Sequence, residues 1–186
     1  MGTLSKNTIY FRQLNENFFT KYRGIDEFLK KNARGHGIMI MDYLDLLVAV
    51  PLRSSLKPYM KKQQFIFPYK VCNKGGKRCL KGMDFSKLII MSEEDLQGSV
   101  GFVFQDDCEK QYYIDNYSKI VNRLGNYIKR YKRLCYQIQE GIQPSITQLR
   151  LYRYSTIRNF HESLGIHLSK ESFILTLQER GLLCSK

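Results

Sequence analysis

The segment between residues 113 and 138 places the strongest constraint on the fold. Its apolar and aromatic residues recur at alternating steps of four and three, at Tyr113, Tyr117, Ile120, Leu124, Tyr127, Tyr131, Leu134 and Ile138. This spacing lines one side of an α-helix. The flank of the same stripe is filled by Ile114, Val121, Ile128 and Cys135. We therefore predict a long amphipathic helix over this segment.

The opposite side of the predicted helix is almost entirely cationic. A run of this kind is ordinarily a solvated helix face. Because nearly all of its charges have one sign, we favour a surface that faces phosphate groups. The cations are Lys119, Arg123, Lys129, Arg130, Lys132 and Arg133.

Short apolar runs precede this helix and predict a small sheet. The runs 37–41 and 46–51 surround a short polar connection and predict a β-hairpin. Pro68 places its strand at a sheet edge, and we expect 73–78 to be a flexible basic loop. Further strands are expected at 9–14, 65–69, 88–91 and 100–104.

The remaining segments predict shorter helices and an α+β fold. A helix is expected to start near residues 15–17, and the polar run 92–95 is typical of another helix start. Gly141 and Pro144 mark a break, after which helices are expected at 149–164 and 169–179. We predict a core at 1–140 and a C-terminal helical extension at 141–186 that packs on it.

The charge of the chain requires an anionic partner. Lys and Arg total 30 against 17 Asp and Glu, which gives a net charge of +13. Nucleic acids and anionic membranes are the usual partners of such chains. No apolar run approaches the ~20 residues that cross a bilayer, and the N-terminus lacks the pattern of a signal peptide. Abundant Tyr and Phe favour RNA, whose unpaired bases stack on aromatic rings.

Cysteine and histidine usage argues against a metal site. The five cysteines are irregularly spaced without a CxxC motif, and the three histidines pair with none of them at ligand spacing. Gly75 and Gly76 lack the residues of a nucleotide-binding loop. We predict a cytoplasmic protein that needs no metal and no cofactor.

Three clusters of cations and hydroxyls lie at the ends of predicted strands. One follows the second hairpin strand at 51–58, one precedes the first hairpin strand at 30–36, and one at 81–87 precedes the strand at 88–91. If these strands form one sheet, the clusters converge at a common edge. The candidate catalytic side chains are Arg53, Ser54, Ser55 and Lys57 in the cluster at 51–58, Arg34 and His36 in the cluster at 30–36, and Ser86 and Lys87 in the cluster at 81–87.

Each cluster also has an ordinary structural explanation. The segment 51–58 is equally a turn with capping serines. His36 is ordinarily a surface imidazole. We interpret Asp84 as a turn residue that bonds its own backbone.

The inventory of the clusters is sufficient for cleaving RNA without a metal. The ribose 2′-OH is a built-in nucleophile, so the protein must take its proton, stabilise the dianionic phosphorane and protonate the departing 5′-oxygen. Arg and Lys stabilise charge, Ser orients and donates, and a Lys or His of lowered pKa shuttles the proton. DNA lacks the 2′-OH and is not an expected substrate.

Several motifs occur in an order typical of one protein family. They are 18–22 (Phe-Phe-Thr-Lys-Tyr), Asn32-Ala33-Arg34, Val50-Pro51-Leu52-Arg53-Ser54, and Gly82-Met83-Asp84-Phe85-Ser86-Lys87 before Leu88-Ile89-Ile90. In this order they resemble the toxins of type III toxin–antitoxin systems, the ToxN/AbiQ family, and especially its TenpN-like branch. The resemblance covers roughly Ile9 to Cys135.

This resemblance implies a fold, an activity and a partner. The fold would be a compact, twisted, partly barrel-like antiparallel sheet similar to that of the Kid and MazF toxins. The activity would be metal-independent endoribonuclease cleavage that leaves a 2′,3′-cyclic phosphate. The partner would be a repeat RNA antitoxin, processed into pseudoknots and bound in a closed protein–RNA assembly. The role would be abortive phage infection or plasmid maintenance.

The resemblance also implies roles for individual residues. Ser54 matches the serine of the active-site loop, Arg53 lies beside it, and Lys57 matches a basic residue just downstream. Arg34 matches a basic residue before the central strand, and Ser86 with Lys87 belongs to the second motif. Many TenpN-like members carry a histidine at the end of the loop where this chain reads Ser55-Leu56-Lys57-Pro58. Lys57 or His36 would then have to move the proton.

Two alternatives remain beside the nuclease. The chain is also explained as a non-catalytic RNA-binding module, which the missing loop histidine favours, or as a structural or DNA-associated basic protein, which the clustered hydroxyls disfavour. If the chain is a nuclease or an RNA-binding module, phosphate contacts are predicted for Lys30, Lys31, Lys61, Lys62, Lys77, Arg78, Lys81, Arg123, Lys129 and Arg130.

Overall fold

A computed structural model describes residues 9–13, 16–22, 24–25, 37–96 and 98–184. It is an α+β protein, as the sequence predicts. The strands are β1 (Tyr10–Gln13), β2 (Gly37–Tyr43), β3 (Leu46–Leu56), β4 (Ile66–Lys74), β5 (Lys77–Asp84), β6 (Ile89–Met91) and β7 (Val100–Gly101). The α-helices are α1 (Glu16–Lys21), α2 (Asp107–Asp115), α3 (Tyr117–Gln139), α4 (Ile146–Tyr152) and α5 (Lys170–Glu179). Single 3₁₀ turns are η1 (Pro58–Lys62), η2 (Phe85–Lys87), η3 (Glu93–Leu96) and η4 (Thr156–Asn159).

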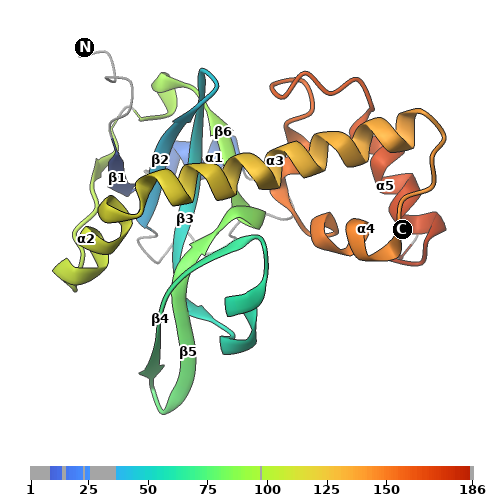
Figure 1. Ribbon diagram of the computed structural model, residues 1–186. Helices are drawn as coiled ribbons and strands as arrows, with labels where there is room; N and C mark the ends of the chain where they lie inside the picture. The colour runs from blue at the N-terminus through green and yellow to red at the C-terminus, as the bar shows by residue number, and fades with distance from the viewer. Residues whose placement is uncertain (1–8, 14–15, 23, 26–36, 97, 185–186) are drawn as a thin grey trace.

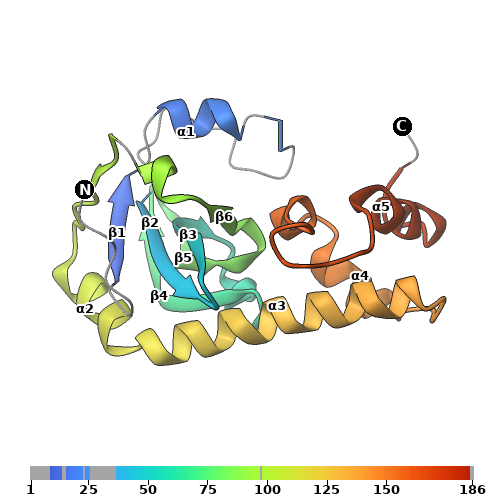
Figure 2. The ribbon, with the colours of Figure 1, turned by 90° about the horizontal axis from the view of Figure 1, so that it is seen from above.

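The strands form one antiparallel sheet in the order β4-β5-β3-β2-β1-β7, with β6 paired to β3. Among the described strands, β4 and β7 end this order without pairing to each other, so the sheet is not a closed barrel. Pro68 lies in β4 and therefore at the edge, as predicted. Figure 2 shows α1 on one side of the sheet and α3 along the other.

The hairpin of β2 and β3 confirms the predicted pairing. Its turn residues, Leu44 and Asp45, both have positive φ, as a tight two-residue hairpin turn requires. The predicted strand at 100–104 is reduced to β7, and the helix predicted from 92–95 is the single turn η3.

Two segments near the centre of the chain differ from the prediction. The expected basic loop at 73–78 is mostly strand, since β4 and β5 pair as far as Lys74 and Lys77. Only Gly75 and Gly76 form the turn, with φ of 55° and 72°, values that glycine adopts without steric cost. The second hairpin strand also continues past Pro51 to Leu56, because β5 provides it with a hydrogen-bonding partner.

The predicted long helix is interrupted once and otherwise confirmed. It breaks at Asn116, whose side-chain amide donates to the carbonyl of Tyr112 at 2.9 Å, a local bond that competes with helix continuation. Beyond the break, α3 buries the predicted stripe. The Cβ of an alanine at Gly125 would lie 2.8 Å from the Tyr43 ring, so the helix backbone approaches the sheet closely at this glycine.

The C-terminal half of α3 packs against residues 144–184 (Figure 1). Tyr127 donates to Ser155 Oγ at 2.8 Å, and Tyr131 lies 2.6 Å from Nε2 of His161. Burial lowers the pKa of His161, so its neutral ring accepts from Tyr131 and donates through Nδ1 to Leu168 O. Leu149, Phe173 and other buried residues of this region join the hydrophobic cluster of the sheet.

The helix predicted at 149–164 is wrong beyond residue 152. α4 ends at Tyr152, and Ser155 is extended, with its side chain accepting the N–H of Ile157 at the start of η4. Thr156 then donates to the carbonyls of Ser86 and Leu88. The last predicted helix is confirmed as α5.

Asp95 connects α1 to the end of β6. Its buried carboxylate accepts from Lys21 at 2.5 Å, from Tyr22 at 3.0 Å and from the backbone N–H of Ser92 at 2.9 Å. Burial alone would raise the pKa of Asp95, but these three donors outweigh it and lower the pKa below its usual 3.8.

We expect Asp95→Asn to destabilise the protein by about 1–3 kcal/mol near neutral pH, because it removes the charge that these donors pair with. A lowered pKa in the folded state contributes stability above 3.8 that is lost as the pH falls through the folded value. The difference from wild type should therefore shrink in acid, as urea unfolding would show. The exposed Asp115→Asn serves as control, and an equal loss in both variants would contradict this role.

Candidate functional site

Arg53 and Ser86, two predicted site residues, are joined through hydrogen bonds to Asp84. The register pairs Arg53 with Gly82, which brings the end of β5 beside β3. Arg53 Nη1 donates to Asp84 Oδ2 at 3.3 Å. The other oxygen, Oδ1, accepts from the Ser86 hydroxyl at 2.6 Å and from its backbone N–H at 3.1 Å. One carboxylate thus fixes both a guanidinium and a hydroxyl.

Asp84 is buried while Arg53 reaches the surface. The Asp84 side chain is 4% exposed and that of Arg53 is 27% exposed. Burial raises the pKa of Asp84, and the Ser86 hydroxyl and the Arg53 charge act against this rise without cancelling it. The bond to the Ser86 backbone is the turn interaction that the sequence predicts for Asp84. The ion pair with Arg53 is additional.

Ser54 contacts a different partner from Arg53. The register between β3 and β5 shifts from Arg53–Gly82 to Leu56–Leu80, so the strand gains one residue as a bulge at Ser54 and Ser55. Both serines are exposed, and Ser54 Oγ accepts from Lys74 Nζ at 3.2 Å. The sequence predicted these residues in a loop after the strand. They lie within β3, at a bulge.

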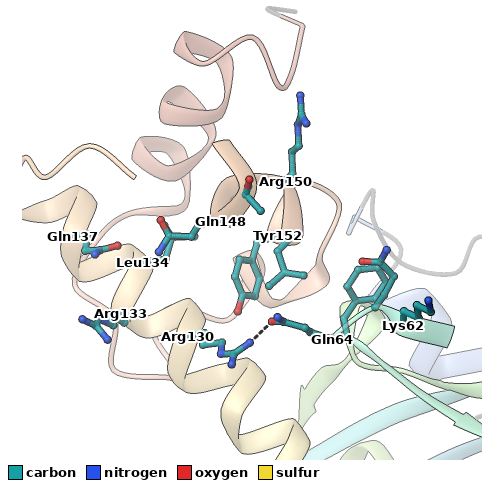
Figure 3. Close-up of a pocket in the computed structure, with 13 residues that line it drawn as sticks. Lys62, Gln64, Arg130, Arg133, Leu134, Gln137, Gln148, Arg150 and Tyr152 are labelled. Carbon is teal, nitrogen blue, oxygen red and sulfur yellow. Dashed lines mark hydrogen bonds between the residues drawn. The ribbon is translucent and has the colours of Figure 1, made fainter. Parts of the chain in front are cut away.

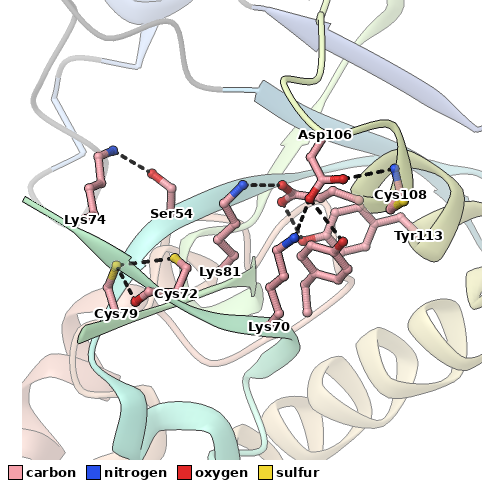
Figure 4. Close-up of polar contacts among 11 residues, drawn as sticks. Ser54, Lys70, Cys72, Lys74, Cys79, Lys81, Asp106, Cys108 and Tyr113 are labelled. Carbon is pink, nitrogen blue, oxygen red and sulfur yellow. Dashed lines mark hydrogen bonds and ion pairs between the residues drawn. The ribbon is translucent and has the colours of Figure 1, made fainter. Parts of the chain in front are cut away.

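Acidic residues at the start of α2 pair with the lysines near this bulge (Figure 4). Lys81 Nζ lies 2.8 Å from Glu109, and Lys70 Nζ lies 2.5 Å from Asp106. Asp106 also accepts from the Tyr69 hydroxyl at 3.3 Å. Lys81 was predicted to bind RNA phosphate, but its charge is matched by Glu109 in this structure.

The remaining predicted catalytic residues are more dispersed. Lys57 is exposed, with its ammonium 5.9 Å from the centre of the Tyr59 ring. Lys87 donates to the carbonyl of Tyr154 at 2.7 Å, which links η2 to the C-terminal region. Arg34, His36, Lys30 and Lys31 lie outside the described residues.

The predicted RNA-binding cations fall into two groups. Lys61, Lys62, Lys77, Arg78 and Lys129 are exposed. Arg130 is also exposed, and both Arg123 and Arg130 contact the segment before β4. Arg123 donates to the carbonyls of Gln63 and Gln64, and Arg130 donates to the side chain of Gln64.

Sequence reasoning missed part of each cluster. Lys74 was placed in a loop, and the ion pair of Asp84 with Arg53 was not foreseen. β5 has no alternation of apolar and polar residues, so its strand, and with it the neighbours of Arg53, carried little local signal. The one signal in the sequence is Asp84 itself, an acid between the apolar residues Met83 and Phe85.

Within the described ranges, no group of three or more His, Cys, Asp and Glu side chains is placed to hold a metal ion. Over the same residues, no helix is both long and apolar enough to cross a membrane.

Comparison with known proteins adds no relative. No protein-family model matches the sequence, no curated protein matches it, and no solved structure matches the fold.

Proposed function

We propose that the chain is a metal-independent endoribonuclease, the toxin of a type III toxin–antitoxin system. The observation that supports this most is the partly exposed Arg53 held on the buried Asp84 beside the Ser86 hydroxyl. An arginine anchored through one nitrogen keeps further donors for a phosphate, in a fixed orientation. Such fixed donors stabilise the charge that develops in a phosphorane.

In this proposal the residues divide the reaction among them. The ribose 2′-oxygen attacks phosphorus, the bond from phosphorus to the 5′-oxygen breaks, and a 2′,3′-cyclic phosphate forms. Arg53 stabilises the phosphorane, and Asp84 is a positioning residue because it is too buried to reach RNA. Ser54 and Lys57 are exposed and lie on the same stretch of chain as Arg53, and in the proposal they contact the RNA. One base takes the 2′-proton, and one acid delivers a proton to the 5′-oxygen.

The partner and setting follow from the same proposal. A folded repeat RNA would cover Arg53 and the exposed Lys57 and inhibit cleavage until it is lost. The proposed fold relationship is to the Kid and MazF toxins, the proposed location is the cytoplasm, and the proposed role is abortive infection. The net charge of +13 is the property that suits an RNA partner.

A non-catalytic RNA-binding module is the second candidate. Two observations favour this candidate. The Ser86 hydroxyl donates its proton to Asp84 rather than toward a substrate. The segment 51–58 contains no histidine that could move a proton. In this candidate, Arg53 and the exposed lysines grip phosphates without cleaving them.

Cleavage of RNA by the purified protein distinguishes the two candidates. We expect the purified protein to cut single-stranded RNA in EDTA, leave cyclic phosphate ends, and spare DNA of the same sequence. Binding to RNA should weaken as salt rises, with a logarithmic slope of roughly 0.7 per phosphate contact. RNA binding without cleavage would favour the second candidate. Cleavage that stops on chelation would refute the metal-independent mechanism.

A further inference from the structure

A pocket of about 820 Å³ lies between α3, α4 and the segment that joins η1 to β4 (Figure 3). It contains no residue of the Arg53–Asp84–Ser86 cluster. Its volume is in the range of pockets that enclose small organic ligands. The residues that line it belong to segments 62–65, 130–137 and 147–152.

The charge of the pocket has one sign. Its lining includes Lys62, Arg130, Arg133 and Arg150, and no lining residue in the described part of the chain is Asp or Glu. Arg130 is oriented by its bond to the Gln64 side chain, which fixes one guanidinium at the pocket wall. Four cations without a carboxylate favour an anionic ligand, and arginine is the residue best suited to phosphate.

A buried hydrogen-bond acceptor in the same pocket limits the kinds of anion that would bind well. Among the described residues, Oε1 of Gln137 is buried and has no hydrogen-bond partner. A buried acceptor left unpaired costs about 1–3 kcal/mol, so a ligand that donates to it would be favoured. Inorganic phosphate is chiefly an acceptor and leaves this need unmet, whereas a base or a ribose supplies N–H and O–H donors.

The pocket also has apolar walls, which a ligand must match. Phe65, Leu134, Leu151 and Tyr152 line the pocket beside the cations. Leu134 and Tyr152 are buried behind the wall, whereas Phe65 and Leu151 are partly exposed and offer the surface on which a flat ring stacks while its phosphate meets the arginines. Together these features describe a ligand with a phosphate, a donor and a flat apolar body.

We propose that this pocket binds a nucleoside phosphate. The ligand is either an unpaired nucleotide of a bound RNA strand or a free mononucleotide, since both present the same chemistry. The phosphate meets an arginine of the lining, and a base or ribose donor faces Gln137. The proposal does not depend on nuclease activity, because the pocket and the Arg53 cluster share no residue.

Titration calorimetry with the full chain provides the test. The probes are adenosine, guanosine, cytidine and uridine monophosphates, the corresponding nucleosides, inorganic phosphate, and a single-stranded RNA pentanucleotide. We expect at least one monophosphate to bind more tightly than both its nucleoside and inorganic phosphate. Tighter binding of the pentanucleotide that is weakened by Arg133→Gln or Arg150→Gln assigns the site to an RNA strand, and equal binding assigns it to a free nucleotide.

Matched variants locate the binding. At least one of Arg133→Gln and Arg150→Gln should weaken monophosphate binding by about 10- to 100-fold, the effect of one charge-assisted hydrogen bond. Lys110→Gln changes the same charge on an exposed position of α2 outside the pocket and should leave binding within about 2-fold. Gln137→Leu should weaken the monophosphate and leave inorganic phosphate unchanged.

Several results would overturn the proposal. They are the absence of saturable binding by any nucleotide probe, binding that neither arginine variant weakens, and inorganic phosphate binding as tightly as every monophosphate. Thermal melts of each variant confirm that a loss of binding is not a loss of fold. RNA cleavage is measured in the same samples, so failure of this site and failure of the nuclease are seen separately.

Discussion

Replacing Arg53 with lysine is expected to lower RNA cleavage by about 100- to 1000-fold, the usual effect of losing one positioned donor to a developing oxyanion. Lysine keeps a positive charge beside Asp84, so the buried carboxylate stays paired and the fold is retained. What is lost is the planar fork, which holds Asp84 at 3.3 Å through one nitrogen and has further donors for a phosphate. Single-turnover cleavage of a labelled RNA measures the effect.

The control for this prediction is Arg180→Lys. Arg180 directly follows α5 and belongs to none of the proposed sites, so this change should leave the rate nearly unaltered. RNA binding by the Arg53 variant should fall far less than cleavage, because many other cations share the phosphate contacts. Wild-type cleavage by a stable Arg53→Lys protein would remove this residue from the proposed mechanism.

Gly82→Ala is expected to destabilise the protein strongly. A Cβ at this position would lie 2.5 Å from the carbonyl oxygen of Phe67 and 3.1 Å from Cα of Pro68. Both obstructing atoms belong to the backbone of β4, so no side-chain rotation relieves the clash. We expect a loss near the upper end of the about 1–3 kcal/mol that overpacking costs, which lowers the melting temperature by roughly 6–12 °C.

The site should fail together with the fold in this variant. Gly82 pairs with Arg53, and Asp84 follows two residues later, so moving β4 from β5 displaces the carboxylate that orients Arg53. Gly101→Ala is the matched control, because a Cβ there meets no atom within 4 Å. Equal melting temperatures for the two variants would contradict the close approach of β4 and β5 at Gly82.

Local patterns in the sequence predict much of the secondary structure. The apolar stripe of α3 is readable because a buried helix side repeats with the helical period. The first hairpin is readable because two apolar runs flank a short polar connection. The Gly75–Gly76 turn was seen as glycine-rich but assigned to a longer loop, because the charged strands around it lack the alternation that identifies a half-buried strand.

The candidate site is less predictable, since it depends on contacts between distant residues. Arg53 and Asp84 are 31 residues apart, and Lys87 and Tyr154 are 67 apart. The sequence supplied Arg53, Ser54 and Ser86 as candidates. It grouped Arg53 with Ser54, whereas the structure gives them separate partners, because the bulge and the register of β5 determine which side chain each one meets.

The sequence by itself determined the α+β class, the long amphipathic helix, the edge position of Pro68 and the excess of positive charge. These depend on local periodicity, on the missing N–H of proline and on composition, none of which requires a distant partner. Only the tertiary structure decided the pairing of β5 with β3, the Arg53–Asp84–Ser86 cluster and the cationic pocket between α3 and α4. Each of these forms where backbone hydrogen bonds and buried side chains from separate segments satisfy one another, and such pairing leaves no periodic trace in either segment alone.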